Sequence, residues 1–254
     1  MPLTVTKPTT ERFLKILIYG DYGVGKTHLA GSAAEAPEMR DVLYVDVEAG
    51  ALTLARLGWD IDVVRVQKYP EFNTIYNFLR AHTSAPDEKL PEINAKIGAA
   101  PTRRYRTLVV DSITEIQKLA MYHILGVMPD KAQLDVPPDA PEFKEWGQSA
   151  EMMRLLIRAL RELPMHVILV AAAQEREDEK KRLRYLPALP GKLAYEVQGL
   201  VDVVGFLTMG RAAEGKLVRR LWLQPGDNFS AKDRYWGGNP PMIEEPTMTK
   251  LLRR

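Results

Sequence analysis

The sequence predicts an α/β protein with a mainly parallel, twisted sheet, helices on both faces and a C-terminal antiparallel hairpin. Short apolar runs alternate with helical stretches along the chain, and several of these runs are continuously apolar over most of their length instead of alternating with polar residues. Alternating strands and helices are typical of parallel sheets, and continuous apolar strands are expected where both faces are covered. Hydrophobic residues make up 46% of the 254 residues, which is enough for one sizeable core.

The apolar and helical patterns also give the expected elements. We expect strands at 14–19, 42–47, 63–66, 107–111, 166–172, 201–209 and 217–223, and helices at 26–36, 71–82, 113–125, 142–163 and 193–199. The turn at 210–215 joins the last two strands into the antiparallel hairpin. Loops are expected at 85–104 and 126–141.

The expected domain organisation is a single core with two appendages. Residues 1–12 form an N-terminal extension, residues 13–224 the core, and residues 225–254 a tail that is rich in proline and glycine. The tail is expected to pack on the core without a core of its own.

Composition excludes several classes of function. The chain has no cysteine, so disulfides, thiolate zinc sites and cysteine nucleophiles are excluded. No apolar stretch approaches the roughly 20 residues that span a bilayer, and the first residues lack a signal-peptide core. We therefore expect a cytoplasmic protein that does not bind membranes. The net charge of +2 leaves nucleic-acid binding to local basic patches.

The most specific motif lies between the first expected strand and the first expected helix. It follows the pattern G-x-x-x-x-G-K-[ST] and comprises Gly20, Asp21, Tyr22, Gly23, Val24, Gly25, Lys26 and Thr27. Its glycines let backbone N–H groups and a helix N-terminus point at phosphate oxygens. Lys26 is expected to reach the β- and γ-phosphates, and the Thr27 hydroxyl to bind Mg²⁺. We count His28 with this site, its alternative role being that of a surface helix residue.

A second motif is the apolar strand 107–110 followed by Asp111 and Ser112. After a phosphate-binding loop, a strand that ends in aspartate is typical of the acidic group that holds Mg²⁺, usually through water. Many buried strands also end in aspartate because it caps the next helix, so this motif is weaker alone.

The strand 42–47 ends in Asp46 and Val47 and is followed by Glu48. Ligands of open α/β sheets bind at the carboxyl ends of strands, so Glu48 can accept a hydrogen bond from a water placed at the γ-phosphate. The alternative is a Glu that favours a helix N-terminus.

These motifs, with Gln174 after a buried strand, resemble the RecA-like recombinase core, over roughly residues 14–223. The run 231–234 and the compact size further resemble the short RecA-like ATPases of bacteriophages, which are linked to single-strand annealing. The resemblance implies ATP as ligand, a catalytic Glu48, and a Gln174 that senses the γ-phosphate and signals to a DNA-binding loop. It also implies single-stranded DNA and a single-strand-binding protein as partners, and a homo-oligomer with nucleotide at subunit interfaces. No segment plainly matches the family's polymerisation motif.

Residues 175–184 are the first candidate for DNA contacts. Four acids precede the basic residues Lys180, Lys181, Arg182 and Arg184, which are suited to phosphate contacts. Tyr185 is a candidate for stacking on a base. The alternative is a solvated surface loop. A second candidate is the pair Phe143 and Trp146, which either stack on bases or anchor the helix 142–163.

A lysine or arginine from a neighbouring subunit often completes such sites by neutralising transition-state charge. Lys192, at the start of a helix, is the first candidate and Arg184 the second. Arg219 and Arg220 either serve the same role or only decorate an edge strand.

Three classes of function remain open. The first is a DNA-dependent ATPase in recombination or annealing, the second a nucleotide-switched mediator with slow hydrolysis. The third is another P-loop enzyme, such as a helicase loader or a small-molecule kinase. A loader is expected to have an acidic residue after Asp111, where Ser112 stands. No segment clearly supplies a kinase lid, and the charged residues 175–184 stay open for that role.

Overall fold

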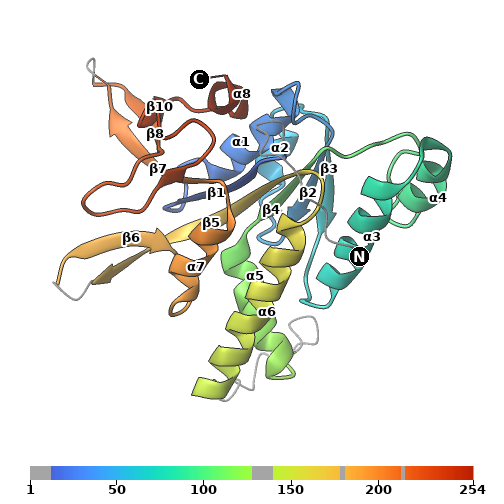
Figure 1. Ribbon diagram of the computed structural model, residues 1–254, viewed down its shortest axis with the longest axis horizontal. Coiled ribbons are helices and arrows are strands. Elements are labelled where there is room, and N and C mark those ends of the chain that lie inside the picture. The colour runs from blue at the N-terminus through green and yellow to red at the C-terminus, as the bar shows by residue number, and fades with distance from the viewer. Residues whose placement is uncertain (1–12, 128–139, 178–180, 213–214, 254) are drawn as a thin grey trace, which may run out of the picture.

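The computed structural model describes residues 13–127, 140–177, 181–212 and 215–253. Its centre is a sheet with the strand order β10-β8-β7-β1-β5-β4-β2-β3 (Figure 1). From β7 to β3 all neighbouring strands are parallel. These strands are β1 (Lys15–Gly20), β2 (Val42–Asp46), β3 (Ile61–Arg65), β4 (Thr107–Asp111), β5 (His166–Glu177) and β7 (Val203–Arg211).

The remaining strands are antiparallel. β8 (Leu217–Trp222) forms the expected hairpin with β7, and β10 (Met242–Glu244) pairs with β8 at the sheet's edge. β9 (Lys232–Asp233) pairs with β7, and β6 (Leu183–Pro187) pairs with β5 beyond the parallel region. The expected fold class, an α/β fold with a mainly parallel sheet and a C-terminal antiparallel hairpin, is therefore confirmed.

Helices cover both faces of the sheet. One hydrophobic cluster contains residues of α3 (Glu71–Ser84), α5 (Ile113–Ile124), α6 (Phe143–Arg161) and α7 (Leu193–Leu200). The cluster on the opposite face contains residues of α1 (Lys26–Gly31), the 3₁₀ helix η1 (Ser32–Glu35), α2 (Leu52–Ala55) and α8 (Met248–Leu252). The 3₁₀ helix η2 (Asp87–Lys89) leads into α4 (Leu90–Ala95), which packs on α3.

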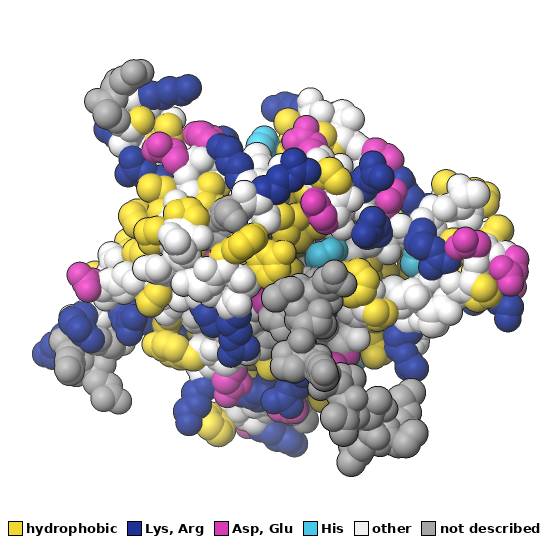
Figure 2. Space-filling model, turned by 45° about the horizontal axis from the view of Figure 1, so that its top comes forward, with side chains coloured by type: hydrophobic (Ala, Val, Ile, Leu, Met, Phe, Trp, Pro, Cys, Tyr) yellow, Lys and Arg dark blue, Asp and Glu magenta, His cyan; other side chains and the backbone are white. Residues whose placement is uncertain are grey.

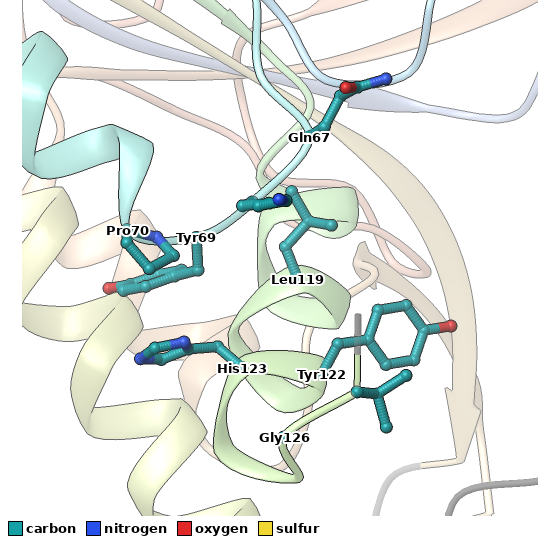
Figure 3. Close-up of a pocket in the computed structure, with 9 residues that line it drawn as sticks. Gln67, Tyr69, Pro70, Leu119, Tyr122, His123 and Gly126 are labelled. Carbon is teal, nitrogen blue, oxygen red and sulfur yellow. The ribbon is translucent and has the colours of Figure 1, made fainter. Parts of the chain in front are cut away.

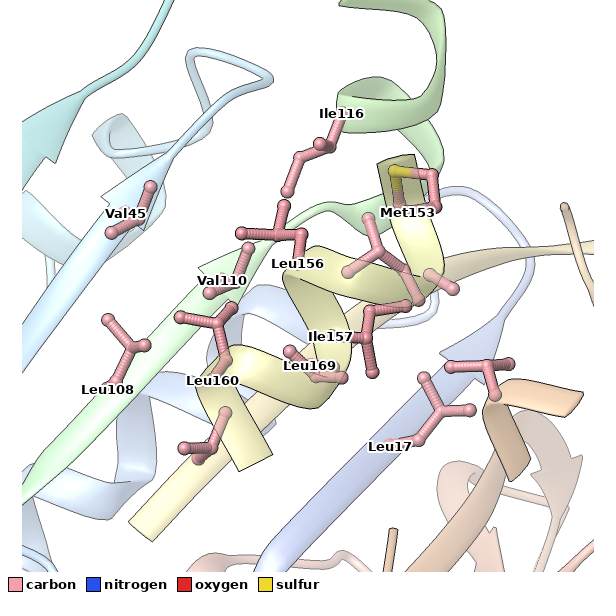
Figure 4. Packing of buried hydrophobic residues seen from close by; sticks show 14 of the residues in the cluster. Leu17, Val45, Leu108, Val110, Ile116, Met153, Leu156, Ile157, Leu160 and Leu169 are labelled. Atoms are coloured by element: carbon pink, nitrogen blue, oxygen red, sulfur yellow. The ribbon is translucent and has the colours of Figure 1, made fainter. Parts of the chain in front are cut away.

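The strands divide their side chains between these two clusters. In β1, Leu17 and Tyr19 point to the first cluster, and Ile16 and Ile18 to the second, as a period of two requires. Figure 4 shows Leu17 among the other buried residues where α6 crosses the sheet. Each fully buried aliphatic side chain contributes about 1.5–3 kcal/mol, so this packing holds the strand ends that carry the site in place.

Several expectations about local structure were wrong. Residues 85–104 are not one loop, because η2 and α4 lie there. The expected helix 26–36 is a short α1 followed by η1. In its described part, the charged segment after Gln174 is largely strand, since β5 continues to Glu177 and pairs with β6, which begins at Leu183.

The tail from residue 225 contributes to both the sheet and the core. Its strands β9 and β10 pair with β7 and β8, and Met248 and Leu251 of α8 are buried in the second cluster. The stretches 1–12 and 128–139 lie outside the described residues. In the part of the chain that the structure describes, no helix has the length and apolar character needed to cross a membrane.

Candidate nucleotide-binding site

The G-x-x-x-x-G-K-[ST] segment forms a tight loop between β1 and α1. β1 ends at Gly20, which pairs with Ala172 of β5 on one side and Leu207 of β7 on the other. The backbone adopts positive φ angles at Gly23 (77°) and Gly25 (98°), which side chains with a Cβ rarely tolerate. The loop thus turns sharply from the sheet into the N-terminus of α1, the geometry that favours an anion.

Lys26 lies across this loop. Its Nζ donates hydrogen bonds to the backbone oxygens of Gly20 (3.0 Å) and Asp21 (2.8 Å), and it lies 5.5 Å from the ring centre of Tyr22. Burial lowers the pKa of Lys26, while Asp111, Glu48 and Asp21 act in the opposite direction. Tyr22 itself is 76% exposed at the tip of the loop. A flexible ammonium at this position suits phosphate binding as a point charge.

The end of β4 meets the start of α1 at Asp111. Its Oδ2 accepts hydrogen bonds from the Thr27 hydroxyl (2.7 Å) and from the buried Tyr44 hydroxyl of β2 (2.5 Å). Burial, and then the neighbouring Asp111 carboxylate, raise the pKa of Tyr44, so it remains a donor. A hydroxyl and a carboxylate beside a phosphate-binding loop are the oxygen ligands that Mg²⁺ takes together with substrate phosphates. Thr27 and Asp111 therefore fit the expected Mg²⁺ site.

Glu48 is exposed just beyond the carboxyl end of β2. Its carboxylate accepts a hydrogen bond from the hydroxyl of Ser112, the residue after Asp111. The neighbouring acid, Asp46, is buried and accepts hydrogen bonds from the backbone N–H groups of Gly50 (3.0 Å) and Ala51 (3.2 Å). The two acids thus differ: Asp46 fixes the turn before α2, and Glu48 is presented at the strand ends with its orientation set by Ser112.

Gln174 lies farther along β5, where that strand pairs with β6. Its Nε2 donates to the carbonyl oxygens of Pro187 (2.8 Å) and Leu189 (2.9 Å). Arg176 donates to Leu189 as well, at 2.6 Å, and to Gly191 at 2.7 Å. The Gln174 amide group therefore ties β5 to the segment that leads into α7.

The candidate DNA-binding cations gather near the tip of the β5–β6 hairpin. Lys181 and Arg182 are exposed, and basic side chains mark this tip at the left of Figure 2. Arg184 is half-buried, and its Nε has no hydrogen-bond partner among the described residues. Lys180 lies outside the described residues.

The aromatic candidates have different environments. The Tyr185 ring stacks on Phe206, with ring centres 5.5 Å apart, so this face of the ring is already used in packing. Phe143 is 94% exposed at the start of α6, and Trp146 is 41% exposed. Phe143 therefore does not anchor its helix in the core.

The residues considered as a cation for the site of a neighbouring subunit also lie in different environments. Lys192 is exposed at the N-terminus of α7. Arg219 contacts the phosphate-binding loop of its own chain, and Arg220 pairs with Glu244 (3.3 Å). His28 is half-buried near Trp59, with ring centres 5.2 Å apart; burial and then Arg219 lower its pKa.

A pocket of about 170 Å³ lies apart from this loop (Figure 3). It is formed by the turn between β3 and α3 and by the last turns of α5, and Tyr69, Tyr122 and His123 contribute rings to its wall. The hydroxyl of Tyr69 donates to the Met152 carbonyl (2.9 Å), which joins this wall to α6.

Sequence reasoning missed two residues of the site. Tyr44 looks like an ordinary member of an apolar strand, and only the register of β2 against β4, which aligns Asp46 with Asp111, brings its hydroxyl to that carboxylate. In the sequence, Ser112 is noted only because a helicase loader would have an acidic residue at this position. A serine directly after the strand-end Asp111 is also a typical N-cap residue, and its hydroxyl does accept a hydrogen bond from the N–H of Glu115 (3.3 Å) at the start of α5. This capping pattern is the signal that could have drawn attention to Ser112.

Known proteins were compared with this chain at the level of sequence and of fold. A search of curated proteins gave no match. Among solved structures, the flagellar accessory protein FlaH from Methanocaldococcus jannaschii aligns with 12% identity and a TM-score of 0.42, over 93% of this chain and 87% of FlaH. A family model described as an AAA domain matches residues 12–235. The chain belongs to this AAA domain family and carries a P-loop ATPase domain.

Proposed function

We propose that this protein hydrolyses ATP and acts on single-stranded DNA in homologous recombination or strand annealing. The ATPase domain supports the hydrolysis of ATP, and the action on single-stranded DNA is the part that we add to it. The proposal includes a homo-oligomer, with nucleotide at the interfaces between subunits.

The arrangement of the site supports hydrolysis. Lys26 and the N–H groups of the loop bind the phosphates, and Thr27 and Asp111 are the residues that would hold Mg²⁺, which neutralises phosphate charge when bound. The Glu48 carboxylate, oriented by Ser112, accepts a hydrogen bond from the attacking water. Because the transition state of phosphoryl transfer is loose, positioning this water matters more than a strong base.

One observation carries the link to DNA: β5 runs between the two strands that bear the nucleotide-binding groups. Along its first half it pairs with β1, which leads into the phosphate-binding loop, and with β4, which ends in Asp111. Its second half leaves the parallel sheet and forms the hairpin whose tip carries Lys181 and Arg182. A movement of the phosphate-binding loop would therefore be passed along the backbone of β5 to the basic residues at the tip of the β5–β6 hairpin.

The side chains along β5 support the same route. The N–H of Ala172, which is paired with Gly20, donates to the hydroxyl of Thr114 in the first turn of α5 (3.0 Å). Two residues later, Gln174 holds the β6 side of the hairpin. Basic side chains on an exposed tip are suited to a phosphate backbone, whose binding depends on charge more than on sequence.

The decisive experiment is ATP hydrolysis by the full chain with and without single-stranded DNA, with double-stranded DNA of the same sequence as control. Strong stimulation by single strands alone is expected. Lys26→Ala is the negative control, because removing its ammonium abolishes its interaction with the phosphates. Undiminished hydrolysis by Lys26→Ala would contradict the site itself.

A different result would favour a different function. If ATP binds and hydrolysis stays slow with either DNA, the nucleotide-switched mediator is the better description, and the charged hairpin becomes a protein-binding surface. In that case Glu48→Gln would leave the biological activity largely intact.

The oligomer can be tested by mixing two inactive variants. Lys192→Ala lacks the proposed cation, and Glu48→Gln lacks the carboxylate that orients water. If Lys192 acts across an interface, about a quarter of the interfaces in a random 1:1 mixture recover both groups, and hydrolysis returns in proportion. No recovery would assign Lys192 to its own subunit, whereas full activity of Lys192→Ala alone would show that Lys192 has no catalytic role.

A further inference from the structure

Arg219 of β8 reaches the phosphate-binding loop of its own chain. Its Nε donates a hydrogen bond to the backbone oxygen of Val24 at 3.2 Å. Within the sheet, Arg219 is paired with Met209 of β7, and β7 lies beside β1. The Arg219 side chain thus reaches from β8, past the neighbouring strand β7, to the loop that follows β1.

The direction of this hydrogen bond has a consequence for the loop. In a planar trans peptide, the C=O of one residue and the N–H of the next point to opposite sides. Because the Val24 oxygen points toward Arg219, the Gly25 N–H points away from it. N–H groups that turn inward in such a loop are the groups that bind phosphate oxygens. The Arg219 hydrogen bond therefore fixes the orientation of one of these donors.

The absence of a side chain at Gly25 makes room for Arg219. A Cβ at Gly25 would lie 2.5 Å from the Nε of Arg219, and φ at this position is 98°. The guanidinium thus occupies the space beside the glycine, and any larger residue there would displace it.

Glu245, in the C-terminal segment, holds Arg219 in turn. Its carboxylate lies 3.5 Å from Nη1 of Arg219 and accepts a hydrogen bond from the Arg219 backbone N–H at 3.0 Å. The Glu245 N–H donates back to the Arg219 oxygen at 2.8 Å. Three residues later, the Met248 N–H donates to the Ser32 hydroxyl at 2.8 Å, just after α1. The C-terminal segment therefore contacts both Arg219 and the region that follows α1.

We propose that Arg219, held by Glu245, is a positioning residue that keeps the Val24–Gly25 peptide turned so that the Gly25 N–H faces the phosphates of the nucleotide. This role rests on the binding of a nucleoside triphosphate at the loop and is independent of DNA. It also makes the C-terminal segment part of the nucleotide-binding unit. Arg219 acts here within its own chain, a role different from both that of a cation for a neighbouring subunit and that of an edge-strand surface residue.

The test measures MgATP binding by titration calorimetry, and kcat and KM in the absence of DNA. Removing one hydrogen bond from a charged donor corresponds to about a 10-fold change in affinity, so Arg219→Ala is expected to raise Kd and KM about 10-fold. The kcat at saturating ATP should change much less, because the groups at the γ-phosphate remain. Arg219→Lys keeps the charge and is expected to recover part of the affinity.

Two controls make the outcome specific. Arg211→Ala removes a guanidinium from the same β7–β8 hairpin, where Nη1 donates to the Gly215 oxygen at 3.1 Å, and should leave Kd unchanged. Glu245→Gln should shift Kd in the same direction as Arg219→Ala, and the double variant should add little, since Glu245 acts through Arg219. If Arg219→Ala does not fold, Glu245→Gln provides the test of the same interaction.

The outcomes separate this inference from the proposed function. If the wild type binds MgATP, Lys26→Ala does not, and both Arg219→Ala and Glu245→Gln bind like the wild type, Arg219 has no positioning role. If the wild type itself fails to bind MgATP, the proposed function fails with it. A fall in kcat at unchanged KM would also overturn the inference, because it would place Arg219 at the transition state.

Discussion

The Thr27 hydroxyl donates a 2.7 Å hydrogen bond to Oδ2 of Asp111 and so joins the first turn of α1 to the end of β4, 84 positions along the chain. The same oxygen accepts from Tyr44 on the neighbouring strand β2. Three elements, α1, β2 and β4, thus converge on one carboxylate, and the parallel register of β2 against β4 sets the positions of the two strands. The protein's own hydroxyl groups therefore orient this carboxylate.

Tyr44→Phe should therefore weaken Mg²⁺ binding without removing a ligand. Groups that orient a metal ligand typically contribute about 10- to 100-fold to metal affinity, so the Mg²⁺ concentration for half-maximal hydrolysis should rise about 10-fold. Tyr105→Phe is a matched control, since Tyr105 donates to Asp62 at 2.7 Å just before the start of β4, at the end of that strand opposite to Asp111. Equal Mg²⁺ requirements in both variants would show that Tyr44 is only a packing residue.

Glu48→Gln should retain MgATP binding and lower kcat by about 10²-fold or more, because a neutral amide accepts a weaker hydrogen bond from the attacking water than a carboxylate and orients it less well. Ser112→Ala removes the hydrogen bond that orients Glu48 and should lower kcat less. If Ser112 acts through Glu48, the double variant will match Glu48→Gln alone. Wild-type kcat in Glu48→Gln would instead support the helix-capping role.

The parts of the site that lie within one continuous segment could be predicted from the sequence. The loop from Gly20 to Thr27 has a fixed pattern because each position has a local backbone or phosphate-binding role. The placement of Asp111 and Glu48 at one edge of the sheet could also be predicted, because the carboxyl ends of parallel strands meet there. The strand cores were equally clear, since buried parallel strands are apolar at nearly every position.

The remaining features depend on interactions between distant segments. Arg219 is 195 positions from Val24, and nothing in the run 217–223 indicates which side chain reaches the loop. The β5–β6 hairpin was missed because its residues are charged, a composition typical of solvated loops. Its strands are held instead by pairing and by the Gln174 amide group. In the tail, prolines and glycines likewise conceal the few apolar residues, such as Met248, that pack into the core.

His166 predicts an acid-dependent decrease in stability. It is 7% exposed at the start of β5, and its Nδ1 accepts a hydrogen bond from the Leu14 N–H at 3.1 Å. Burial, followed by the nearby Lys15 and Arg106, lowers the pKa of His166 to about 4. Between pH 6.5 and 4 the unfolded chain binds a proton at this residue that the folded chain does not, so the free energy of unfolding falls as the pH falls. The decrease is about 3 kcal/mol when complete.

His166→Asn keeps an acceptor for the Leu14 N–H and removes the titrating group. Urea unfolding at a series of pH values between 7 and 4 should therefore show a smaller pH dependence for the variant than for the wild type. The difference between the two curves isolates His166 from the carboxylates that also titrate in this range. Parallel curves would mean that His166 is protonated equally easily in the folded chain.

The basic tip of the hairpin gives the last prediction. Lys181→Gln combined with Arg182→Gln should weaken binding of single-stranded DNA. It should also reduce the dependence of log K on log salt concentration by about 0.7 for each DNA phosphate that is no longer neutralised. The matched control is Arg158→Gln with Arg161→Gln, which changes the net charge equally at exposed positions near the end of α6. If both pairs change the slope alike, the effect is one of overall charge and the tip is not the DNA site. A change confined to the hairpin pair, with ATP hydrolysis in the absence of DNA unaltered, would place the DNA-binding site on the hairpin that continues β5 beyond the nucleotide site.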